Sequence, residues 1–338
     1  MKPLFRFGVV AVVGVASALT GTSAVHAKES GATRAPASLS TVVSTVVSTS
    51  AASTVAEQNR ITRYWTSARM KAAKAGEALA PKRSILAGRS AVVAGKPTTV
   101  GATAAKDTVA ALSTGDPYTG GGAVVRTTGK VFFTLGGSDY VCSGSAVTST
   151  NKDTVLTAGH CVHEGPGSFA TNWAFVPGYS NGNRPFGTFT ARRLLTTTAW
   201  ARRGDFNYDV GFALMNAVSG KDLTDTVGGQ GIAFNQSRGK YMYAFGYPAA
   251  SPYDGSDLIH CDGTVFQDTY GNSTDQGMNC DMTGGSSGGP WFYNFNTSTG
   301  AGTLNSVNSF GYTGLDDVMW GPYFGSTISS LYNTAKTG

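Results

Sequence analysis

The stretch TGGSSGGPW, residues Thr283–Trp291, places two serines among four glycines and a proline. Glycine loses more conformational freedom on folding than any other residue, so such a cluster needs a local reason. One interpretation is a flexible surface turn. The other is a nucleophilic serine whose neighbours must leave room for a substrate backbone. The rest of the sequence decides between these two interpretations.

A nucleophilic serine needs a base, and a histidine lies at the end of an apolar strand pattern. His160 occurs in VLTAGHCV, and a neighbouring imidazole activates a hydroxyl by accepting its proton. The imidazole needs an acid that fixes its tautomer, and Asp209 in NYDVGFALM begins another apolar run. The order is His160, Asp209, Ser287, with gaps of 49 and 78 residues. Subtilisin-like chains and α/β-hydrolases use other orders, so only the chymotrypsin order fits.

Other candidates for the acid and the base are weaker. Asp205 lies in RRGDFN, a turn with two arginines, which favours a solvated loop carboxylate. His163 and His260 are interpreted as a surface histidine and a structural histidine, respectively. We therefore prefer Asp209 and His160 for the catalytic roles.

The region from about residue 123 onward has the sequence pattern of an all-β protein. Short β-branched and aromatic runs, such as GKVFFTL (129–135) and KYMYAFGYP (240–248), alternate with Gly, Asn, Pro or Asp clusters. Such runs predict a β-sandwich or barrel. Helical character is expected only in the last residues, STISSLYNTA (326–335). The length suits two small barrels with one cleft between them.

Three blocks of this region, TAGHC, YDVGFAL and GSSGGP (285–290), resemble the active-site blocks of the chymotrypsin-like serine proteases. GKVFFTLGGSDYVCSGSAV resembles the secreted bacterial branch near the glutamyl endopeptidases, and RYWTSARM resembles the precursors of that branch. The resemblance covers most of residues 123–338. It implies two antiparallel six-stranded Greek-key β-barrels, with the active site in the cleft between them, in a domain spanning residues 122–338.

The resemblance also implies roles for single residues. Ser287 is the nucleophile, because Gly-x-Ser-Gly-Gly-Pro fits only at that serine. His160 is then the base, Asp209 orients it, and the backbone N–H groups of Gly285 and Ser287 form the oxyanion hole. Ser286 stands where trypsin-like zymogens keep an aspartate, so a new N-terminus cannot lock the pocket by an ion pair. Maturation is therefore expected to remove an inhibitory or folding-assisting propeptide.

The resemblance places substrate binding only coarsely. Three residues of the NSFGY stretch are expected to bind the substrate backbone by β-augmentation: Ser309, Phe310 and Gly311. Asp281, six residues before Ser287, stands where trypsin-like enzymes bind Lys or Arg. Cys280 does not match the usual cysteine spacing, so a structural role for Asp281 stays open. Glutamyl endopeptidases have a histidine near the position of Asn308, and none lies there, so basic residues before the cleaved bond are weakly favoured.

The first 27 residues predict export. Met1–Ala27 has a charged start, an apolar run (Gly8–Leu19) and small residues before Ala27, which is typical of a signal peptide. The apolar run is too short to span a bilayer comfortably. We therefore expect a secreted, extracellular protein with no membrane association after processing.

An exported chain with an even number of cysteines predicts disulfides, although four cysteines allow three pairings. Their spacing does not suit a zinc site, because no Cys-x-x-Cys pair is present. The family resemblance pairs Cys142 with Cys161 and leaves Cys261 with Cys280, each pair closing 19 residues.

Residues 28–121 are interpreted as a propeptide whose end is uncertain, or alternatively as a solvated linker. They carry 12 Lys and Arg against 5 Asp and Glu, whereas residues 122–338 carry 12 against 15. The segment Glu57–Ala78 has helical character, with Ile61, Trp65, Ala68 and Ala72 at helical spacing. We expect this basic helix to dock on acidic loops such as YDGSD (Tyr253–Asp257), more strongly at low salt.

The sequence thus predicts a secreted serine endopeptidase that acts on polypeptides through an acyl-enzyme. Its partners are expected to be polypeptide substrates and its own propeptide, and the protein is expected to be a monomer. The excess of Lys and Arg over Asp and Glu lies in the N-terminal part, so no nucleic-acid binding is inferred. No metal or other cofactor is expected. A catalytically silent binding module and an esterase on the same fold remain as alternatives.

Overall fold

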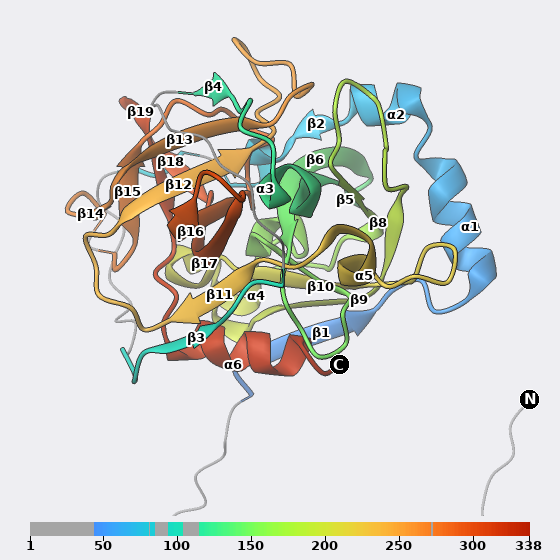
Figure 1. Cartoon of the computed structure of the whole chain (residues 1–338), viewed down its shortest axis with the longest axis horizontal. Helices are drawn as coiled ribbons and strands as arrows, with labels where there is room; N and C mark the ends of the chain where they lie inside the picture. Colours follow the sequence, from blue (N-terminus) through green and yellow to red (C-terminus); the bar gives the residue numbers. More distant parts are fainter. Residues whose placement is uncertain (1–43, 81, 85–93, 104–114, 272) are drawn as a thin grey trace, which may run out of the picture. The chain divides into compact units, whose positions relative to one another are not determined.

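The computed structural model describes residues 44–80, 82–84, 94–103, 115–271 and 273–338. The predicted signal peptide, Met1–Ala27, and the expected start of the propeptide at residue 28 lie outside these residues. Within the described residues, no helix combines the length and the apolar character that a membrane crossing requires. The region after residue 121 is built mainly from β-strands, as the sequence predicted (Figure 1).

The first half of this region is a closed barrel. Its six antiparallel strands, all in the described part of the chain, are β5 (Thr128–Leu135), β6 (Ser138–Ala146), β7 (Thr154–Thr157), β8 (Thr171–Pro177), β9 (Phe189–Thr197) and β10 (Gly211–Met215). β9 pairs with both β10 and β8, which closes the sheet. Alternate residues of β5, such as Val131 and Phe133, fill the barrel interior.

The second half is built from two sheets. One contains β11 (Gly231–Phe234), β12 (Tyr241–Gly246), β13 (Ile259–Thr264), β16 (Pro290–Asn296) and β17 (Ala301–Val307). The other contains β14 (Phe266–Gln267), β15 (Gln276–Asn279), β18 (Phe310–Tyr312) and β19 (Leu315–Gly321). All these pairings are antiparallel except the short parallel pair between β11 and β17. Met278 and Trp291 pack with the Cys261–Cys280 disulfide in a core of this half.

Helices are short and lie between or beside the strands. They are α3 (Ala123–Thr127), α4 (Thr198–Arg203), α5 (Leu223–Val227) and α6 (Ser326–Ala335), with the 3₁₀ turns η2 (Gly159–Cys161) and η3 (Phe206–Tyr208). The helix predicted for the last residues of the chain is therefore present. Its buried residues, among them Ile328 and Leu331, join the core that includes the first barrel.

The segment before residue 122 extends the sheets at their edges. Its strands are β1 (Val46–Ser50), β2 (Lys74–Ala75), β3 (Thr98–Val100) and β4 (Asp116–Pro117). β1 pairs with β9 and β2 with β6, whereas β3 pairs with β11 and β4 with β13. Unpaired strand edges accept such additions readily, because their N–H and C=O groups are free. These described parts of the segment are therefore docked on the strands of both halves.

The helical character predicted for Glu57–Ala78 is correct in kind but not in extent. The structure has α1 (Val55–Tyr64), α2 (Ser67–Ala72), then β2 and the 3₁₀ turn η1 (Gly76–Leu79). Thr66 interrupts the helix, because it is extended and its hydroxyl caps α2. The break changes the buried face, so that Ala68 and Ala72 are exposed and Met70 is buried instead.

The two helices cover an apolar outer face of the first barrel. Phe132, Val141 and Val176 point away from the barrel interior and pack with Trp65 in a separate cluster. Trp65 is completely buried, its ring centre lies 5.6 Å from that of Phe132, and its indole N–H donates to the carbonyl of Asn172. Outward strand positions of a solvated barrel are normally polar, so this apolar face needs a cover.

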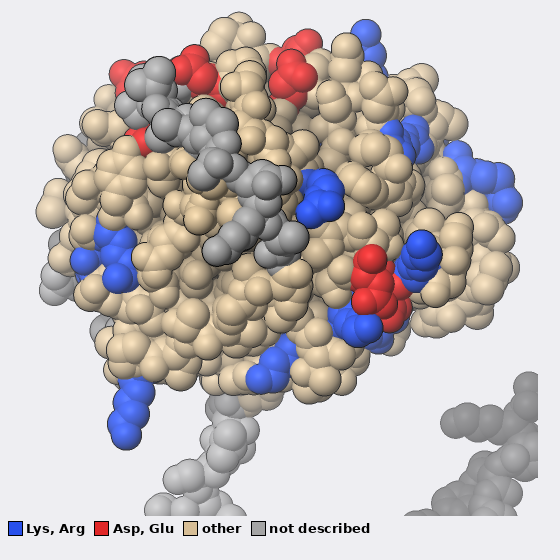
Figure 2. Space-filling model, viewed as in Figure 1, with Lys and Arg blue, Asp and Glu red and all other residues tan. Residues whose placement is uncertain are grey.

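The basic residues of the helices do not bind the loop that the sequence analysis suggested. Figure 2 shows several basic side chains at the edge of the visible face where Figure 1 places α1 and α2. Arg69 forms an ion pair of 3.0 Å with Asp139, which also accepts from the Tyr64 hydroxyl at 2.7 Å. Within the described residues, no ion pair joins α1 or α2 to Tyr253–Asp257. The expected docking partner is therefore wrong, because apolar packing places the helices over β5, β6 and β8.

Candidate active site

His160 and Asp209 are held together by the barrel strands that precede or follow them. His160 lies in η2, directly after β7, and Asp209 lies just before β10, which pairs with β7. Both side chains are completely buried. The Nδ1 atom of His160 lies 2.8 Å from Asp209 Oδ2, and the backbone N–H of His160 donates to Oδ1 at 2.7 Å. The carboxylate therefore fixes both the ring and its backbone.

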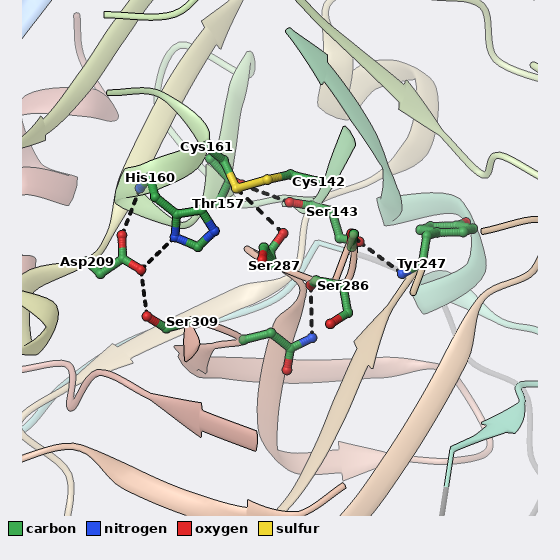
Figure 3. The surroundings of a disulfide bond; sticks show 12 residues. Cys142, Ser143, Thr157, His160, Cys161, Asp209, Tyr247, Ser286, Ser287 and Ser309 are labelled. Atoms are coloured by element: carbon green, nitrogen blue, oxygen red, sulfur yellow. Dashed lines mark hydrogen bonds and ion pairs between the residues drawn. A yellow bond between two sulfur atoms is a disulfide. The ribbon is translucent and has the colours of Figure 1, made fainter. Parts of the chain in front are cut away.

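The other ring nitrogen of His160 faces Ser287. This Nε2 atom is buried and has no hydrogen-bond partner among the described residues. Figure 3 shows the ring with Asp209 on one side and Ser287 toward the other. The Ser286 hydroxyl instead donates to the carbonyl of Thr283 at 2.8 Å. In structures without a bound substrate, the distance between nucleophile and base is often long. The arrangement is therefore compatible with a nucleophilic Ser287.

Ser309 adds a contact that the sequence analysis missed. Its hydroxyl donates to Asp209 Oδ2 at 2.5 Å, so this oxygen accepts from both His160 and Ser309. Sequence reasoning assigned Ser309 only to substrate backbone binding. The position of Ser309 directly before β18 (Phe310–Tyr312) gives no sign of which distant carboxylate its side chain will contact.

The loop around Ser287 presents two free backbone donors. Gly285 has a φ of +97°, and an added Cβ would lie 2.9 Å from the carbonyl of Tyr247. Gly288 has a φ of +78°, and its added Cβ would lie 2.1 Å from Thr157 Oγ1. Neither Gly285 nor Ser287 donates its N–H to another described residue. These glycines allow a tight loop that leaves both N–H groups unpaired within the described part of the chain, so the stretch is more than a flexible turn.

Ser143 fixes this loop from the neighbouring barrel. Its hydroxyl donates to the carbonyl of Gly285 at 2.9 Å, and its backbone N–H donates to the carbonyl of Ser287 at 2.7 Å. The same hydroxyl accepts the backbone N–H of Tyr247 at 2.9 Å. Ser143 therefore positions the loop without an evident sequence signal.

A cavity of about 620 Å³ lies beside Ser287. Its lining includes all the residues that the sequence analysis expected to bind substrate: Asp281, Ser309, Phe310 and Gly311. Asp281 Oδ1 accepts from the Tyr253 hydroxyl at 2.8 Å, so this carboxylate already has a protein partner. Asp316 and Asp317 line the same cavity. The cavity is therefore acidic, but Asp281 is not its sole carboxylate.

The sequence family described as Trypsin matches residues 118–317, which include all the residues named above for the candidate active site. The chain belongs to the trypsin family. It thus carries a trypsin-like serine protease domain, and the predicted resemblance is confirmed.

Solved structures and curated proteins agree with this membership. The protease Anisep from Arthrobacter nicotinovorans is 52% identical, with a TM-score of 0.61, over 64% of this chain and 98% of its own. An extracellular metalloprotease of Bacillus subtilis is 30% identical over 39% of this chain and 38% of its own length. A glutamyl endopeptidase of Bacillus licheniformis is 32% identical over 41% of this chain and 42% of its own. The chain thus matches about two fifths of each curated relative, and the likeness to Anisep confirms the predicted fold class.

Both disulfides that the resemblance implied are present in this trypsin-family chain. Cys142 is bonded to Cys161 and Cys261 to Cys280, so no cysteine is free. The sulfurs of Cys142 and Cys161 and a nitrogen of His160 lie within 4.8 Å of one another. Because both sulfurs are in a disulfide, they offer no thiolates for a metal. The Cys142–Cys161 disulfide lies close to Ser287 (Figure 3).

The structure also places the two other histidines and the rival aspartate that the sequence analysis considered. His260 is buried, and its Nδ1 lies 3.0 Å from the carbonyl of Asp116, which fits the predicted structural role. The prediction that His163 lies on the surface is wrong, because it is buried against the ring of Phe169 and burial lowers its pKa. Asp205 caps η3 by accepting from the backbone N–H of Asn207 and does not reach His160.

Proposed function

We propose that this protein is a secreted serine endopeptidase in which Ser287, His160 and Asp209 form the catalytic triad. One observation carries the proposal: Asp209 holds His160 Nδ1 while the unpartnered Nε2 faces Ser287. With Nδ1–H donated to Asp209, the Nε2 lone pair is free to accept the Ser287 proton.

The reaction follows from these positions. Ser287 Oγ attacks the peptide carbonyl as His160 Nε2 takes its proton, and the N–H groups of Gly285 and Ser287 stabilise the oxyanion. His160 then gives the proton to the leaving amine, which leaves an acyl-enzyme. A water molecule activated by His160 hydrolyses this ester and restores Ser287.

Export is supported by the signal-peptide pattern of Met1–Ala27 and by the two disulfides, which persist in oxidising compartments. Maturation is proposed to remove the segment that ends near residue 121. The alignment with Anisep supports this boundary, because it covers nearly all of that protease but only 64% of this chain. Residues 122–338 make up about the same share.

The segment 44–84 is proposed to inhibit the precursor by occupying the cleft. β2 lies along β6, and an added Cβ on Gly76 would be 2.7 Å from Cys142 Sγ and 3.8 Å from Ser287 Cβ. Ala80 and Lys82 then line the acidic cavity, where Lys82 pairs with Asp316. A substrate and this segment cannot occupy the same space.

The direction of this segment explains why it would not be cut at Ser287. In the proposed reaction, the acyl part of a substrate lies along Ser309–Gly311 and its leaving amine lies near His160. The substrate chain would therefore run from β18 toward the Cys142–Cys161 disulfide. The segment runs in the opposite direction. Its Gly76 lies beside the disulfide, and Arg83, which comes later in the chain, donates its N–H to the carbonyl of Gly311. In this reversed orientation its peptide groups are not aligned for attack.

Basic residues before the cleaved bond are the proposed preference. The cavity beside Ser287 contains three carboxylates, Asp281, Asp316 and Asp317, and the segment that occupies it presents Lys82. Asp281 already accepts a hydrogen bond from Tyr253, so the preference does not rest on Asp281 alone. All three carboxylates together favour a basic side chain in the cavity.

The test is covalent labelling followed by digestion of a denatured protein mixture. A fluorophosphonate should modify Ser287 in the processed enzyme, and mass spectrometry should find peptides cleaved mainly after Lys or Arg. Ser287→Ala should abolish both, whereas Ser286→Ala should keep labelling. Labelling without peptide cleavage would indicate the esterase, and absence of both would indicate the silent binding module. An adduct on Ser286 would contradict the assignment of the nucleophile.

A further inference from the structure

The side chain of Arg83 enters a pocket made of three aromatic rings and a buried carboxylate. Its guanidinium carbon lies 4.8 Å from the ring centre of Phe310, 5.1 Å from Phe206 and 5.7 Å from Tyr312. Its Nη1 atom lies 3.8 Å from Asp275 Oδ2. The Arg83 side chain is only 11% exposed and that of Asp275 is completely buried. We call Phe206, Phe310, Tyr312 and Asp275 the cation cage.

The carboxylate of Asp275 lacks the protein donors that a buried carboxylate normally has. Neither of its oxygens has a hydrogen-bond partner of ordinary geometry among the described residues; the nearby Ser273 hydroxyl lowers the pKa of Asp275 but donates to Asp268. The neighbouring Asp268, by contrast, accepts from the Tyr312 hydroxyl at 2.6 Å and from the backbone N–H of Tyr270 at 2.8 Å. A buried charge without a partner is costly, so the cage is built to receive a cation from outside its own walls.

The cage opens onto the edge where substrate is expected to bind. Phe310 lies in β18, next to Ser309, and Phe206 lies in η3, three residues before Asp209. The backbone N–H of Arg83 donates to the carbonyl of Gly311 at 2.9 Å. A peptide that pairs with this edge therefore passes the mouth of the cage.

We propose that the cation cage is a specificity subsite for an arginine side chain of the substrate, on the acyl side of the cleaved bond. It is separate from the cavity that contains Asp281. Arg83 occupies the subsite in the precursor, and a substrate arginine takes its place once the segment has left. This inference rests on the proposed function as an endopeptidase. Arginine suits the cage better than lysine, because its planar guanidinium stacks on aromatic rings.

Ionisation of Asp275 supports this assignment. Burial raises the pKa of Asp275 to about 8 even though the Arg83 charge lowers it. The charged or titratable groups that interact with it are Arg83, Arg238, Asp205, Asp268 and Tyr312. When no cation fills the cage, Asp275 therefore holds its proton to a still higher pH, and arginine binding favours its ionisation. The preference for arginine should consequently increase as pH rises from 6 to 9.

The experiment compares peptide substrates that differ only in one charge. The processed enzyme is given peptides with arginine or its neutral isostere citrulline at the second, third or fourth residue before the cleaved bond, with all other residues constant. At one of these positions arginine should raise kcat/KM about tenfold over citrulline. In Asp275→Asn this ratio should fall and lose its pH dependence, while the three rings keep part of the preference.

Asp225→Asn is the matched control, because Asp225 pairs with Lys152 on the surface and should leave the ratio unchanged. If Asp275→Asn does not fold, Phe206→Leu should reduce the same ratio by removing one ring of the cage. A ratio near one at every position in the wild-type enzyme, or an undiminished ratio in the variants, would overturn the subsite. Cleavage of none of the peptides would instead overturn the proposed endopeptidase function.

Discussion

Replacing Trp65 by alanine should release the segment 44–84, which we propose to be inhibitory, from the first barrel. The indole is completely buried, and burying a tryptophan removes roughly 150–250 Å² from water, which contributes about 4–6 kcal/mol. Its N–H bond to Asn172 contributes about 1 kcal/mol more. Part of the indole stays buried in the free segment, so we expect a net loss of about 4 kcal/mol, which corresponds to about a thousandfold in affinity.

The assay measures inhibition of the processed enzyme by purified residues 28–121 added in trans. Trp65→Ala should raise the inhibition constant by about a thousandfold, whereas Trp65→Phe should raise it far less because a ring still fills the site. Val55→Ala is the control in the same helix, since Val55 is 70% exposed and should have almost no effect. Equal inhibition by the Trp65→Ala and wild-type segments would refute the docking argument. No inhibition by the wild-type segment would refute the propeptide assignment itself.

Three other changes test the site and the core. Asp209→Asn should lower kcat by about 10⁴ with an unchanged circular dichroism spectrum, and a near-normal rate would exclude Asp209 as the orienting acid. Gly285→Ala should lower kcat by about 10²–10³, because a Cβ at a φ of +97° distorts the oxyanion donors; an unchanged kcat would contradict their role. Burial lowers the pKa of Lys130 to about 8, below its ordinary 10.5. Between pH 8 and 10.5 the unfolded chain therefore binds one proton more than the folded chain. Urea unfolding of inactive Ser287→Ala protein should therefore show stability rising by at most about 3 kcal/mol between pH 8 and 10.5, and Lys130→Met should remove that rise.

The proximity of His160, Asp209 and Ser287 and the two disulfides could be anticipated, because each depends on a short motif. His160, Asp209 and Ser287 each lie beside a strand whose apolar pattern is visible in the sequence. The structure adds that β7 and β10 are neighbours, which brings the histidine and the aspartate together. Local pattern and chain order were therefore enough for this part of the site.

The supporting contacts could not be anticipated, because they join residues whose separation in sequence carries no signal. Ser309 reaches Asp209, and Arg83 reaches Asp275, only after the two halves of the chain have folded against each other. The burial of His163 has the same origin, since the residue after a motif gives no sign of the ring packed on it. Tertiary packing overrides what its local sequence suggests.

The overall charge imbalance between the segment and the domain suggested that docking would depend mainly on electrostatics. Apart from the buried pair of Arg83 with Asp275, the ion pairs observed between them are exposed: Arg69 and Asp139 are 50% and 17% exposed, and Lys82 and Asp316 are 51% and 70% exposed. Pairs of this kind contribute about 0–1 kcal/mol each and weaken with salt. Trp65, the strand edges and the Arg83 side chain supply contacts that salt screens much less. Raising the ionic strength should therefore slow the association of the segment, as long-range attraction is screened, while changing its affinity far less than Trp65→Ala does.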